Sequence, residues 1–352
     1  MAERVLDVVG TAVAGSEPPP PLLTRHLTAI DTALRRAAPT PRTLLGRMTS
    51  YHMGWCDSEG RPSLAPSGKR FRPALALWAC EAAGGAPEWA LPAAVATELI
   101  HNFTLIHDDI QDGDLQRRHR PTVWSIWGAA QGINAGDGVF AQALRTLLAA
   151  GPRPERRMHA AHALSAAVVE VVEGQCLDLA IEGSPSASPQ TYLRLAAAKT
   201  GALLGASMAA GALIGGADEA CAARFDAAGR LLGLAFQVRD DWLGMWGDSD
   251  RTGKADDSDL RRRKVTYPIV AAYEIATGVQ RRELRHAFRE RGPQSDLRLR
   301  ALLEELGGAT LTAGAPLVLA RDAVAALDPR DVSHDCLRQF AEVAVYVAER
   351  DS

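Results

Sequence analysis

The sequence has 352 residues, of which 47% are hydrophobic and 5% aromatic, and its formal net charge is -3. This length suffices for one large domain or two ordinary ones, and the charge excludes a general attraction to nucleic acid or to an anionic membrane. Ala and Leu dominate the apolar residues, which favours helices over strands. The five cysteines are scattered and lack metal-ligand spacing, which indicates a reduced, cytoplasmic protein.

The N-terminal part predicts a leader followed by helices. Residues 1–21 end in a proline run and predict a flexible leader. The segment has acids among its apolar residues and no long apolar region, so it does not match a secretory signal. From Leu22 to about Met53, apolar residues recur at helical spacing. Residues 54–66 contain Gly, Pro, Ser and Asp, and they predict a loop.

The segment GKRFRP places Lys69, Arg70 and Arg72 directly before a helix rich in Ala and Leu. Pro73 suits the first turn of that helix. The basic residues are open to two interpretations, a solvated helix start or a pocket for an anion. The second follows because Arg presents a fork of donors and a helix N-terminus favours phosphate.

Residues 95–114 (VATELIHNFTLIHDDIQDGD) predict a long apolar helix with an acidic end. Asp108 and Asp112 are four residues apart, which places both carboxylates on one helix face at about 6 Å. Asp109 lies beside them, and two polar residues precede Asp108 on nearly the same line, namely His101 and Thr104. A solvated helix end is one interpretation. The other is a site for a hard cation such as Mg²⁺, since like charges at this spacing repel and the ligands are oxygens.

A basic run, RRHR, follows the acids and comprises Arg117, Arg118, His119 and Arg120. Adjacent acidic and basic runs suggest a site that binds metal and polyanion together. Mutual salt bridging is the alternative.

The middle of the chain predicts buried helices. The helix from Met158 to Ala180 carries the segment GQCLDL. The run Thr200–Ala217 is uncharged but rich in Gly, Ala and Ser, so we expect a buried helix rather than a membrane span. Lys199 stands where this run begins, a position at which a lone lysine usually extends its ammonium to water.

The helix from Ala223 to Trp246 contains FQVRDD, in which Asp240 and Asp241 follow Gln237 by three and four residues. The next interval, residues 247–263, is charged and aperiodic, and it predicts a mobile loop. Lys254 lies in this loop and Lys264 follows it. Further helices are predicted from Val279 to the end.

Seven motifs in order resemble one family. They are GKRFRP, ELIHNFTLIHDDIQD, RRHRPT, GQCLDL, KT, FQVRDD and GK…DL…KVTYP, and together they resemble the trans-isoprenyl diphosphate synthases of the polyprenyl synthetase family. The resemblance covers roughly residues 42–352. It implies an all-α fold, an isoprenoid-synthase-type helical bundle around a deep central apolar cavity, as one catalytic domain over residues 22–352 and usually as a homodimer.

The resemblance also implies the reaction and its ligands. Isopentenyl diphosphate would be condensed head to tail with an allylic diphosphate (dimethylallyl, geranyl or farnesyl), with Mg²⁺ as cofactor, about three ions when substrate is bound, or Mn²⁺. The metal ligands would be Asp108, Asp112 and Asp240, with Asp109 and Asp241 in support, and the two acidic regions would face each other across the cavity mouth. The allylic diphosphate would be bound by Arg117, Lys199, Lys254 and Lys264. Isopentenyl diphosphate would be bound by Lys69, Arg72, His101 and Arg118.

The chemistry explains these residue types. Diphosphate leaves only when its charge is neutralised, which metal ions and fixed cations achieve. The resulting allylic carbocation must be kept from water, as an apolar cavity does. Dipoles at Lys199, Thr200 and Gln237 would stabilise the cation.

Three departures from the family pattern stand out. Gly244 replaces a third acid in the second acidic motif, Trp242 is bulky for its position, and His119 replaces a common glycine in the RRG motif. We expect the first to weaken a secondary metal contact.

Product length depends, by resemblance, on residues just before the first acid. Phe103 and Thr104 precede Asp108 by five and four positions. A bulky Phe103 should stop chain growth early, which favours geranylgeranyl diphosphate (C20) and then farnesyl diphosphate (C15).

Three alternatives compete with condensation. A class I terpene cyclase would share the acids but would not need an isopentenyl diphosphate pocket. A non-catalytic subunit of a heteromeric synthase should have lost acids of the first motif, which are intact. A plain helical scaffold explains none of the motif order.

Overall fold

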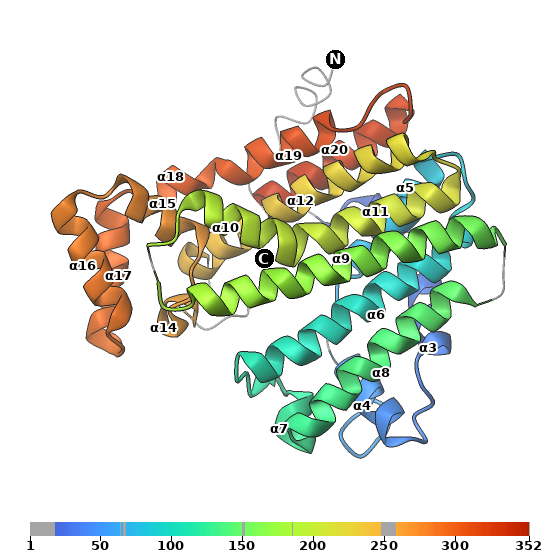
Figure 1. The fold of residues 1–352 in the computed structure, drawn as a ribbon, viewed down its shortest axis with the longest axis horizontal. Helices are drawn as coiled ribbons and strands as arrows, with labels where there is room; N and C mark the ends of the chain where they lie inside the picture. The colour runs from blue at the N-terminus through green and yellow to red at the C-terminus, as the bar shows by residue number, and fades with distance from the viewer. Residues whose placement is uncertain are drawn as a thin grey trace. The chain divides into compact units, whose positions relative to one another are not determined.

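The computed structural model describes residues 18–63, 65, 68–149, 152–184, 186–247 and 258–351. The described residues are almost entirely helical, so the all-α prediction is confirmed (Figure 1). The one small sheet among them pairs β1 (Gln116–Arg117) with β2 (Arg120–Pro121). Of the predicted leader, only residues 18–21 lie within the described ranges.

The chain forms two compact units. One, called the N-unit here, comprises Pro21–Ala166 and Ala206–Ala223, and the other, the C-unit, includes Ala167–Gly205 and Arg224–Ser352. A single catalytic domain over residues 22–352 stays a prediction. Three long helices contain the unit boundaries: α9 (Pro154–Ile181), α11 (Ala202–Gly215) and α12 (Glu219–Trp246).

The N-unit is built around α6. This helix packs against α8 over its length and also against α5, as Figure 1 shows for the teal and green helices. Thr43 caps α4 with its side chain, which accepts a hydrogen bond from the Gly46 amide. The helices that lie wholly in this unit are α2 (Pro21–Thr24), α3 (Leu27–Ala37), α4 (Leu44–His52), α5 (Phe71–Ala82), α6 (Pro87–Gln111), α7 (Val123–Trp127) and α8 (Ala129–Leu148).

The C-unit has an apolar core that includes Tyr192, Val238, Ile269, Phe288 and Leu302. Its own helices are α10 (Pro189–Ala196), the π-helix η1 (Ala197–Gly201), α14 (Ser258–Arg262), α15 (Tyr267–Ile275), α16 (Gly278–Arg289), α17 (Pro293–Glu305), α18 (Gly308–Ala313), α19 (Ala315–Ala325) and α20 (His334–Glu349). Helix α14 corrects the predicted loop over residues 247–263, because the end of that segment is helical and buries Leu260.

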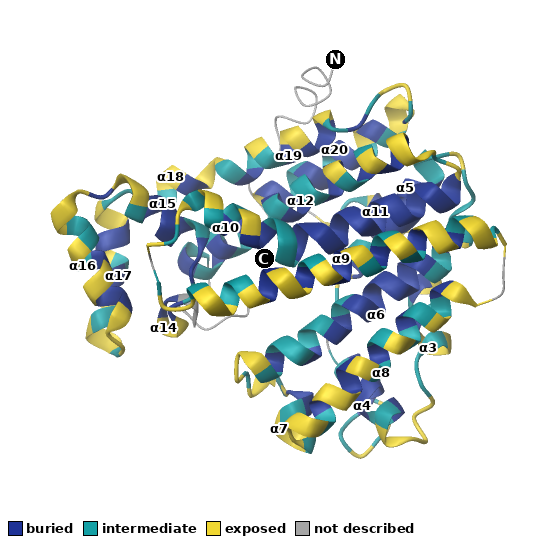
Figure 2. Cartoon of the chain, viewed as in Figure 1, coloured by how far each residue is buried: buried dark blue, intermediate teal, exposed yellow. Residues whose placement is uncertain are grey.

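The uncharged run is a buried helix, as predicted. By length and composition the helical stretch Pro189–Gly215 could cross a membrane, but 83% of its most apolar window is buried inside the protein. Helix α11 is accordingly dark blue in Figure 2. A core helix passes the same test as a membrane span, and this one has the burial of a core helix.

Candidate active site

Helix α6 carries the first pair of acids at its C-terminal end. It ends at Gln111, with Asp112 as the C-cap residue whose N–H bonds to the carbonyl of Asp108 at 2.8 Å. Asp108 is half-buried and Asp112 is exposed. A helix C-terminus already carries partial negative charge, so carboxylates there are destabilising without a cation. The predicted acidic helix end is confirmed, and its electrostatics favour a bound cation.

The donor set at this end fits Mg²⁺. The described residues include no cluster of three or more His, Cys, Asp or Glu side chains that could enclose a metal ion. Mg²⁺ is usually held by one or two carboxylates, with substrate phosphates and waters as further ligands. Asp108 and Asp112 can supply such a pair of carboxylates.

Asp109 is different because it is buried and holds an arginine. Its Oδ1 accepts a hydrogen bond from Arg117 Nε at 2.7 Å, and the residue is 1% exposed. Burial raises the pKa of Asp109 to about 6, although the Arg117 guanidinium lowers it. This contact fits a supporting role, since Asp109 fixes the position of Arg117.

The basic run after the acids folds into a hairpin with a strained turn. Arg117 pairs with Arg120 across the two strands. The turn residues Arg118 and His119 have φ angles of 51° and 60°, in the left-handed region. A two-residue turn of this kind favours Gly or Asn, so Arg and His raise its energy. The departure from RRG to RRH therefore places a side chain where the backbone prefers glycine.

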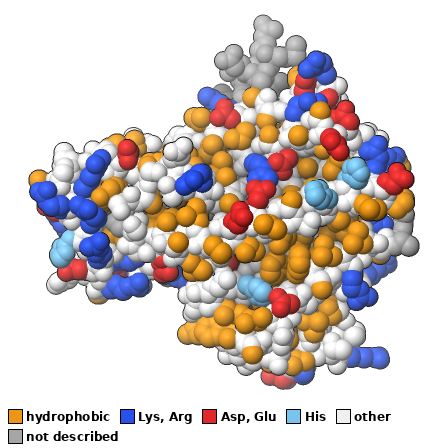
Figure 3. Space-filling model, in the orientation of Figure 1, with side chains coloured by type: hydrophobic (Ala, Val, Ile, Leu, Met, Phe, Trp, Pro, Cys, Tyr) orange, Lys and Arg blue, Asp and Glu red, His pale blue; other side chains and the backbone are white. Residues whose placement is uncertain are grey.

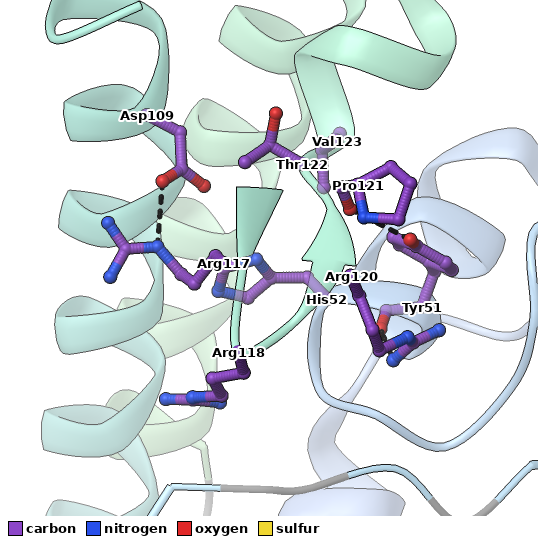
Figure 4. Close-up of a pocket in the computed structure, with 9 residues that line it drawn as sticks. All are labelled: Tyr51, His52, Asp109, Arg117, Arg118, Arg120, Pro121, Thr122 and Val123. Carbon is purple, nitrogen blue, oxygen red and sulfur yellow. Dashed lines mark hydrogen bonds and ion pairs between the residues drawn. The ribbon is translucent and has the colours of Figure 1, made fainter. Parts of the chain in front are cut away.

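A cationic pocket lies between this hairpin and α4 (Figure 4). Its lining residues are Tyr51, His52, Asp109, Arg117, Arg118, Arg120, Pro121, Thr122 and Val123. Burial and then the charges of Arg118 and Arg117 lower the pKa of His52 to about 3. His52 Nε2 is buried and has no hydrogen-bond partner among the described residues.

Three of the four residues predicted to bind isopentenyl diphosphate come together beside this pocket. Burial, then the charges of Arg72 and Arg118, hold the pKa of His101 well below its usual value. Arg72 Nε is buried without a hydrogen-bond partner within the described ranges. A Cβ on Gly68 would lie 3.3 Å from Arg118 Nη2, so the segment before α5 closes against Arg118. Lys69 is exposed. The result is concentrated positive charge that an anion would satisfy.

Arg70, the remaining basic residue of GKRFRP, is structural. Its guanidinium donates to Asp31 and to Glu98, each at 2.8 Å, and the residue is 3% exposed. Asn102 Nδ2 also contacts Glu98. Two of its donors therefore bind carboxylates, which supports a structural role for Arg70, although its Nη2 is buried without a hydrogen-bond partner among the described residues.

The predicted chain-length residue Phe103 is buried in an aromatic cluster. Its ring centroid lies 5.2 Å from that of Phe140 on α8 and 5.1 Å from that of His107. Thr104 Oγ1 donates to the carbonyl of His101 at 2.8 Å. Phe103 and Phe140 therefore form one aromatic contact between α6 and α8.

In the C-unit, Lys199 and Thr200 lie on the π-helix η1, a helix form frequent at functional sites. A Cβ on Gly174 of α9 would lie 2.8 Å from Lys199 N, so close packing at this point requires glycine. Lys199 Nζ donates to Asp178 Oδ2 at 2.8 Å. Lys199 therefore has a defined partner in the GQCLDL motif, unlike a lysine that only reaches for water.

Thr200, Gln237 and Asp241 form a hydrogen-bonded chain. Thr200 Oγ1 donates to Gln237 Oε1 at 2.8 Å, and Gln237 Nε2 donates to Asp241 Oδ1 at 2.9 Å. Asp241 Oδ2 accepts from the Tyr192 hydroxyl at 2.5 Å and from the Tyr267 amide at 3.0 Å. Burial and the charge of Asp241 hold the pKa of Tyr192 well above its usual value.

The second acidic motif contains one buried acid and one partly exposed acid. Asp241 is 1% exposed, whereas Asp240 is partly exposed and pairs with Arg350 at 3.2 Å. Lys264 Nζ lies 4.0 Å from Asp241 Oδ1. Lys254 lies outside the described residues.

Trp242, one of the two departures in this motif, is accommodated by packing. Trp242 Nε1 donates to the carbonyl of Ala309 at 3.1 Å, and its ring lies 5.9 Å from that of Trp246. The bulky indole therefore packs within the C-unit, and Gly244 is half-buried beside it in sequence.

Three residues of the candidate site were not predicted from the sequence, namely His52, Tyr192 and Arg350. Tyr192 precedes Lys199 by seven residues, two helical turns, which could have placed both on one face. His52 and Arg350 carried no such signal, because their partners are distant in the chain.

The comparison with known families decides the assignment. The sequence model of one family, described as polyprenyl synthetase, matches residues 55–306. The chain belongs to the polyprenyl synthetase family. As a member of it, the protein is a prenyltransferase, and the resemblance seen in its motifs is confirmed.

Named relatives and solved structures agree with this family. The chain is 44% identical over 252 residues to the geranylgeranyl diphosphate synthase of Mycobacterium tuberculosis, covering 71% of each chain. It is 41% identical over 296 residues to the (2E,6E)-farnesyl diphosphate synthase of Mycobacterium bovis, covering 81% of this chain and 82% of the other. The crystal structure of a polyprenyl synthetase from Streptomyces coelicolor superposes with a TM-score of 0.86 at 39% identity, covering 93% of this chain and 98% of that one.

Proposed function

We propose that this polyprenyl synthetase condenses isopentenyl diphosphate head to tail with an allylic diphosphate and releases C20 or C15 diphosphate. The observation that carries the proposal is the cationic cluster of Arg72, His101 and Arg118. It contains a buried Arg72 Nε with no hydrogen-bond partner in the described part of the chain. A cyclase that ionises a single prenyl diphosphate has no need for a second diphosphate pocket. The relatives named geranylgeranyl and farnesyl diphosphate synthase support the same reaction class.

The acids and the remaining cations would handle the allylic diphosphate. Asp108, Asp112 and Asp240 would hold Mg²⁺ or Mn²⁺, which when bound neutralises diphosphate as the C–O bond breaks. The cations that would grip the same group are Arg117, Lys199, Lys254 and Lys264. Lys69 would join the cluster that binds isopentenyl diphosphate.

Neutral dipoles would then stabilise the allylic carbocation. The backbone carbonyl of Lys199, the hydroxyl of Thr200 and the amide of Gln237 present oxygen atoms without adding full charges. The diphosphate released in the first step is the proposed acceptor of the proton lost on condensation.

Product length would be limited by Phe103, with Thr104 beside it. The ring of Phe103 is 8% exposed and is backed by Phe140, so it presents a rigid aromatic wall. This wall supports a short product, with C20 favoured over C15.

We also propose a cytoplasmic homodimer. Val169, Val172 and Leu179 on α9 are 59%, 48% and 43% exposed, and their spacing of three and seven residues places them on one helix face. Figure 3 shows hydrophobic side chains along the course of α9. An exposed apolar stripe of this kind is typical of a protein–protein interface.

Labelled isopentenyl diphosphate tests the reaction. The protein is incubated with Mg²⁺, the label and dimethylallyl, geranyl or farnesyl diphosphate in turn, and the products are sized by chromatography. Incorporation of label with any primer supports a synthase and gives its product length. A cyclic hydrocarbon formed from the allylic diphosphate alone would instead identify a cyclase. If the protein showed turnover only after a partner protein was added, it would be a subunit of a heteromeric enzyme.

A further inference from the structure

Tyr192 is a residue to which neither the motifs nor the proposed reaction assign a role. It lies on α10, is 1% exposed, and donates its hydroxyl hydrogen bond to Asp241 Oδ2 at 2.5 Å. Asp241 Oδ2 also accepts from the Tyr267 amide at 3.0 Å. Two donors from different elements therefore fix the plane of a buried carboxylate.

The fixed carboxylate determines which way the Gln237 amide faces. An ionised carboxylate can only accept hydrogen bonds, so the group that Gln237 presents to Asp241 Oδ1 must be its NH₂, which lies 2.9 Å away. The carbonyl oxygen of Gln237 must then face Thr200. A flipped amide would set the Gln237 carbonyl oxygen against a carboxylate oxygen in a buried site, which is unfavourable because both atoms are acceptors.

The Gln237 orientation in turn decides the state of the Thr200 hydroxyl. Gln237 Oε1 lies 2.8 Å from Thr200 Oγ1 and has no proton, so the hydroxyl must donate to it. A hydroxyl has one proton and two lone pairs. Once the proton is committed to Gln237, the oxygen of Thr200 can offer only lone pairs to anything else that approaches it.

We propose that Tyr192 is a positioning residue that, through Asp241 and Gln237, holds the Thr200 hydroxyl with its lone pairs available to the developing allylic carbocation. The inference rests on the proposed condensation. The fixed hydroxyl gives the Thr200 dipole one direction. A hydroxyl whose proton could rotate toward the carbocation would repel the carbocation, whereas a lone pair held toward the carbocation attracts it. Preorganised dipoles of this kind act in the transition state more than in substrate binding.

Tyr192→Phe removes the hydroxyl alone and tests the proposal. With saturating Mg²⁺, isopentenyl diphosphate and geranyl diphosphate, we expect kcat to fall about tenfold while both KM values stay within about twofold. The matched control is Tyr273→Phe on α15, which removes a tyrosine hydroxyl of the same unit that does not touch Asp241. It should retain wild-type kcat.

A double-mutant cycle separates positioning from general loosening of the fold. In a Thr200→Val background, which has no hydroxyl to orient, adding Tyr192→Phe should change kcat by less than about twofold. A tenfold further loss in that background would show that Tyr192 acts independently of Thr200 and would overturn the proposal. Full kcat in the single Tyr192→Phe variant would overturn it as well.

A second variant covers a folding failure of Tyr192→Phe. Asp241→Asn keeps the shape of the side chain but can donate as well as accept, so Gln237 loses its enforced orientation. We expect kcat to fall at saturating Mg²⁺, and an unchanged kcat would contradict the proposal. Wild-type protein that incorporates no isopentenyl diphosphate would refute the proposed reaction instead, which is a distinguishable result.

Discussion

Arg350, two residues before the end of the chain, places its guanidinium Nη2 3.2 Å from Asp240 Oδ1. The arginine is held there from two other sides. Its guanidinium lies 4.0 Å from the centroid of the Phe236 ring, and its carbonyl accepts a hydrogen bond from Arg239 Nε at 2.8 Å. A side-chain cation therefore contacts the acid proposed to bind Mg²⁺ through the second motif.

Arg350→Gln should tighten Mg²⁺ binding, because the metal no longer competes with a guanidinium for Asp240. The expected gain is about fivefold in Kd, equivalent to about 1 kcal/mol for an ion pair of this kind. Isothermal titration of the substrate-free protein with MgCl₂ measures it. Arg338→Gln is the control and should leave Kd unchanged, since Arg338 lies on α20, the helix that Arg350 follows, and pairs with Asp335 and Glu342. Weaker binding in Arg350→Gln would show that Arg350 does not compete with the metal.

Asp108→Ala should abolish turnover and leave the fold intact. The side chain is half-buried at the end of α6, so its loss removes charge from the helix C-terminus without opening the core. Activity and the circular dichroism melting curve are measured together. Asp137→Ala, an exposed acid on α8, should keep wild-type activity. An active Asp108→Ala variant would mean that the metal assignment is wrong.

Phe103→Ala should lengthen the products. The change removes the ring that contacts Phe140 and leaves space beside α8, at a cost of about 3 kcal/mol in the free energy of unfolding. Product size is read by chromatography after incubation with farnesyl and labelled isopentenyl diphosphate. Phe340→Ala on α20 also loses a buried ring and should leave product length unchanged. Products of wild-type length from Phe103→Ala would remove Phe103 from the cavity floor.

Arg70→Met should lower the free energy of unfolding by about 3 kcal/mol, because it leaves the buried Glu98 carboxylate without its charged partner. Urea unfolding followed by circular dichroism gives the value. Arg61→Met is the control: it removes an exposed arginine that also pairs with two carboxylates, and it should leave the free energy of unfolding nearly unchanged because solvent screens these pairs. Equal losses in the two variants would argue against a structural role for Arg70.

His52 should make the protein less stable as pH falls from about 6.5 toward 3. Its pKa is about 3 in the folded protein against 6.5 when unfolded, so over this range the unfolded chain binds a proton that the native state does not. The free energy of unfolding therefore decreases toward low pH, with a contribution from this group of about 1.4 kcal/mol per pH unit.

His52→Asn should remove that contribution. Unfolding free energies at pH 7 and pH 5 should differ less in the variant than in the wild type, by about 2 kcal/mol. His159→Asn, an exposed histidine on α9, serves as the control and should keep the wild-type pH dependence. Identical pH dependence in wild type and His52→Asn would mean that His52 is accessible to protons in the folded state.

The fold class and the main helices were predictable because their signals are local. Apolar residues at helical spacing predicted α6 and α12, and the run of small apolar residues predicted the buried helix α11. The loop predicted over residues 247–263 was wrong at its end, since Leu260 is buried by tertiary contacts and supports α14, and residues 248–257 lie outside the described ranges. Local polarity alone gives no sign of that burial.

The sequence by itself determined the family and the chemical types at the site. Seven motifs in order were enough for that, whereas each acidic or basic motif taken alone also fits a solvated helix end or mutual salt bridging. Tertiary structure decided which of these side chains already have partners. Arg70 forms ion pairs with Asp31 and Glu98, whereas the Arg72 guanidinium forms none with the described residues. Each guanidinium still has one buried nitrogen without a hydrogen-bond partner among these residues, Arg70 Nη2 and Arg72 Nε. Two arginines two residues apart look alike in a sequence, and only the partners brought from distant segments separate the structural cation from the one left for an anion.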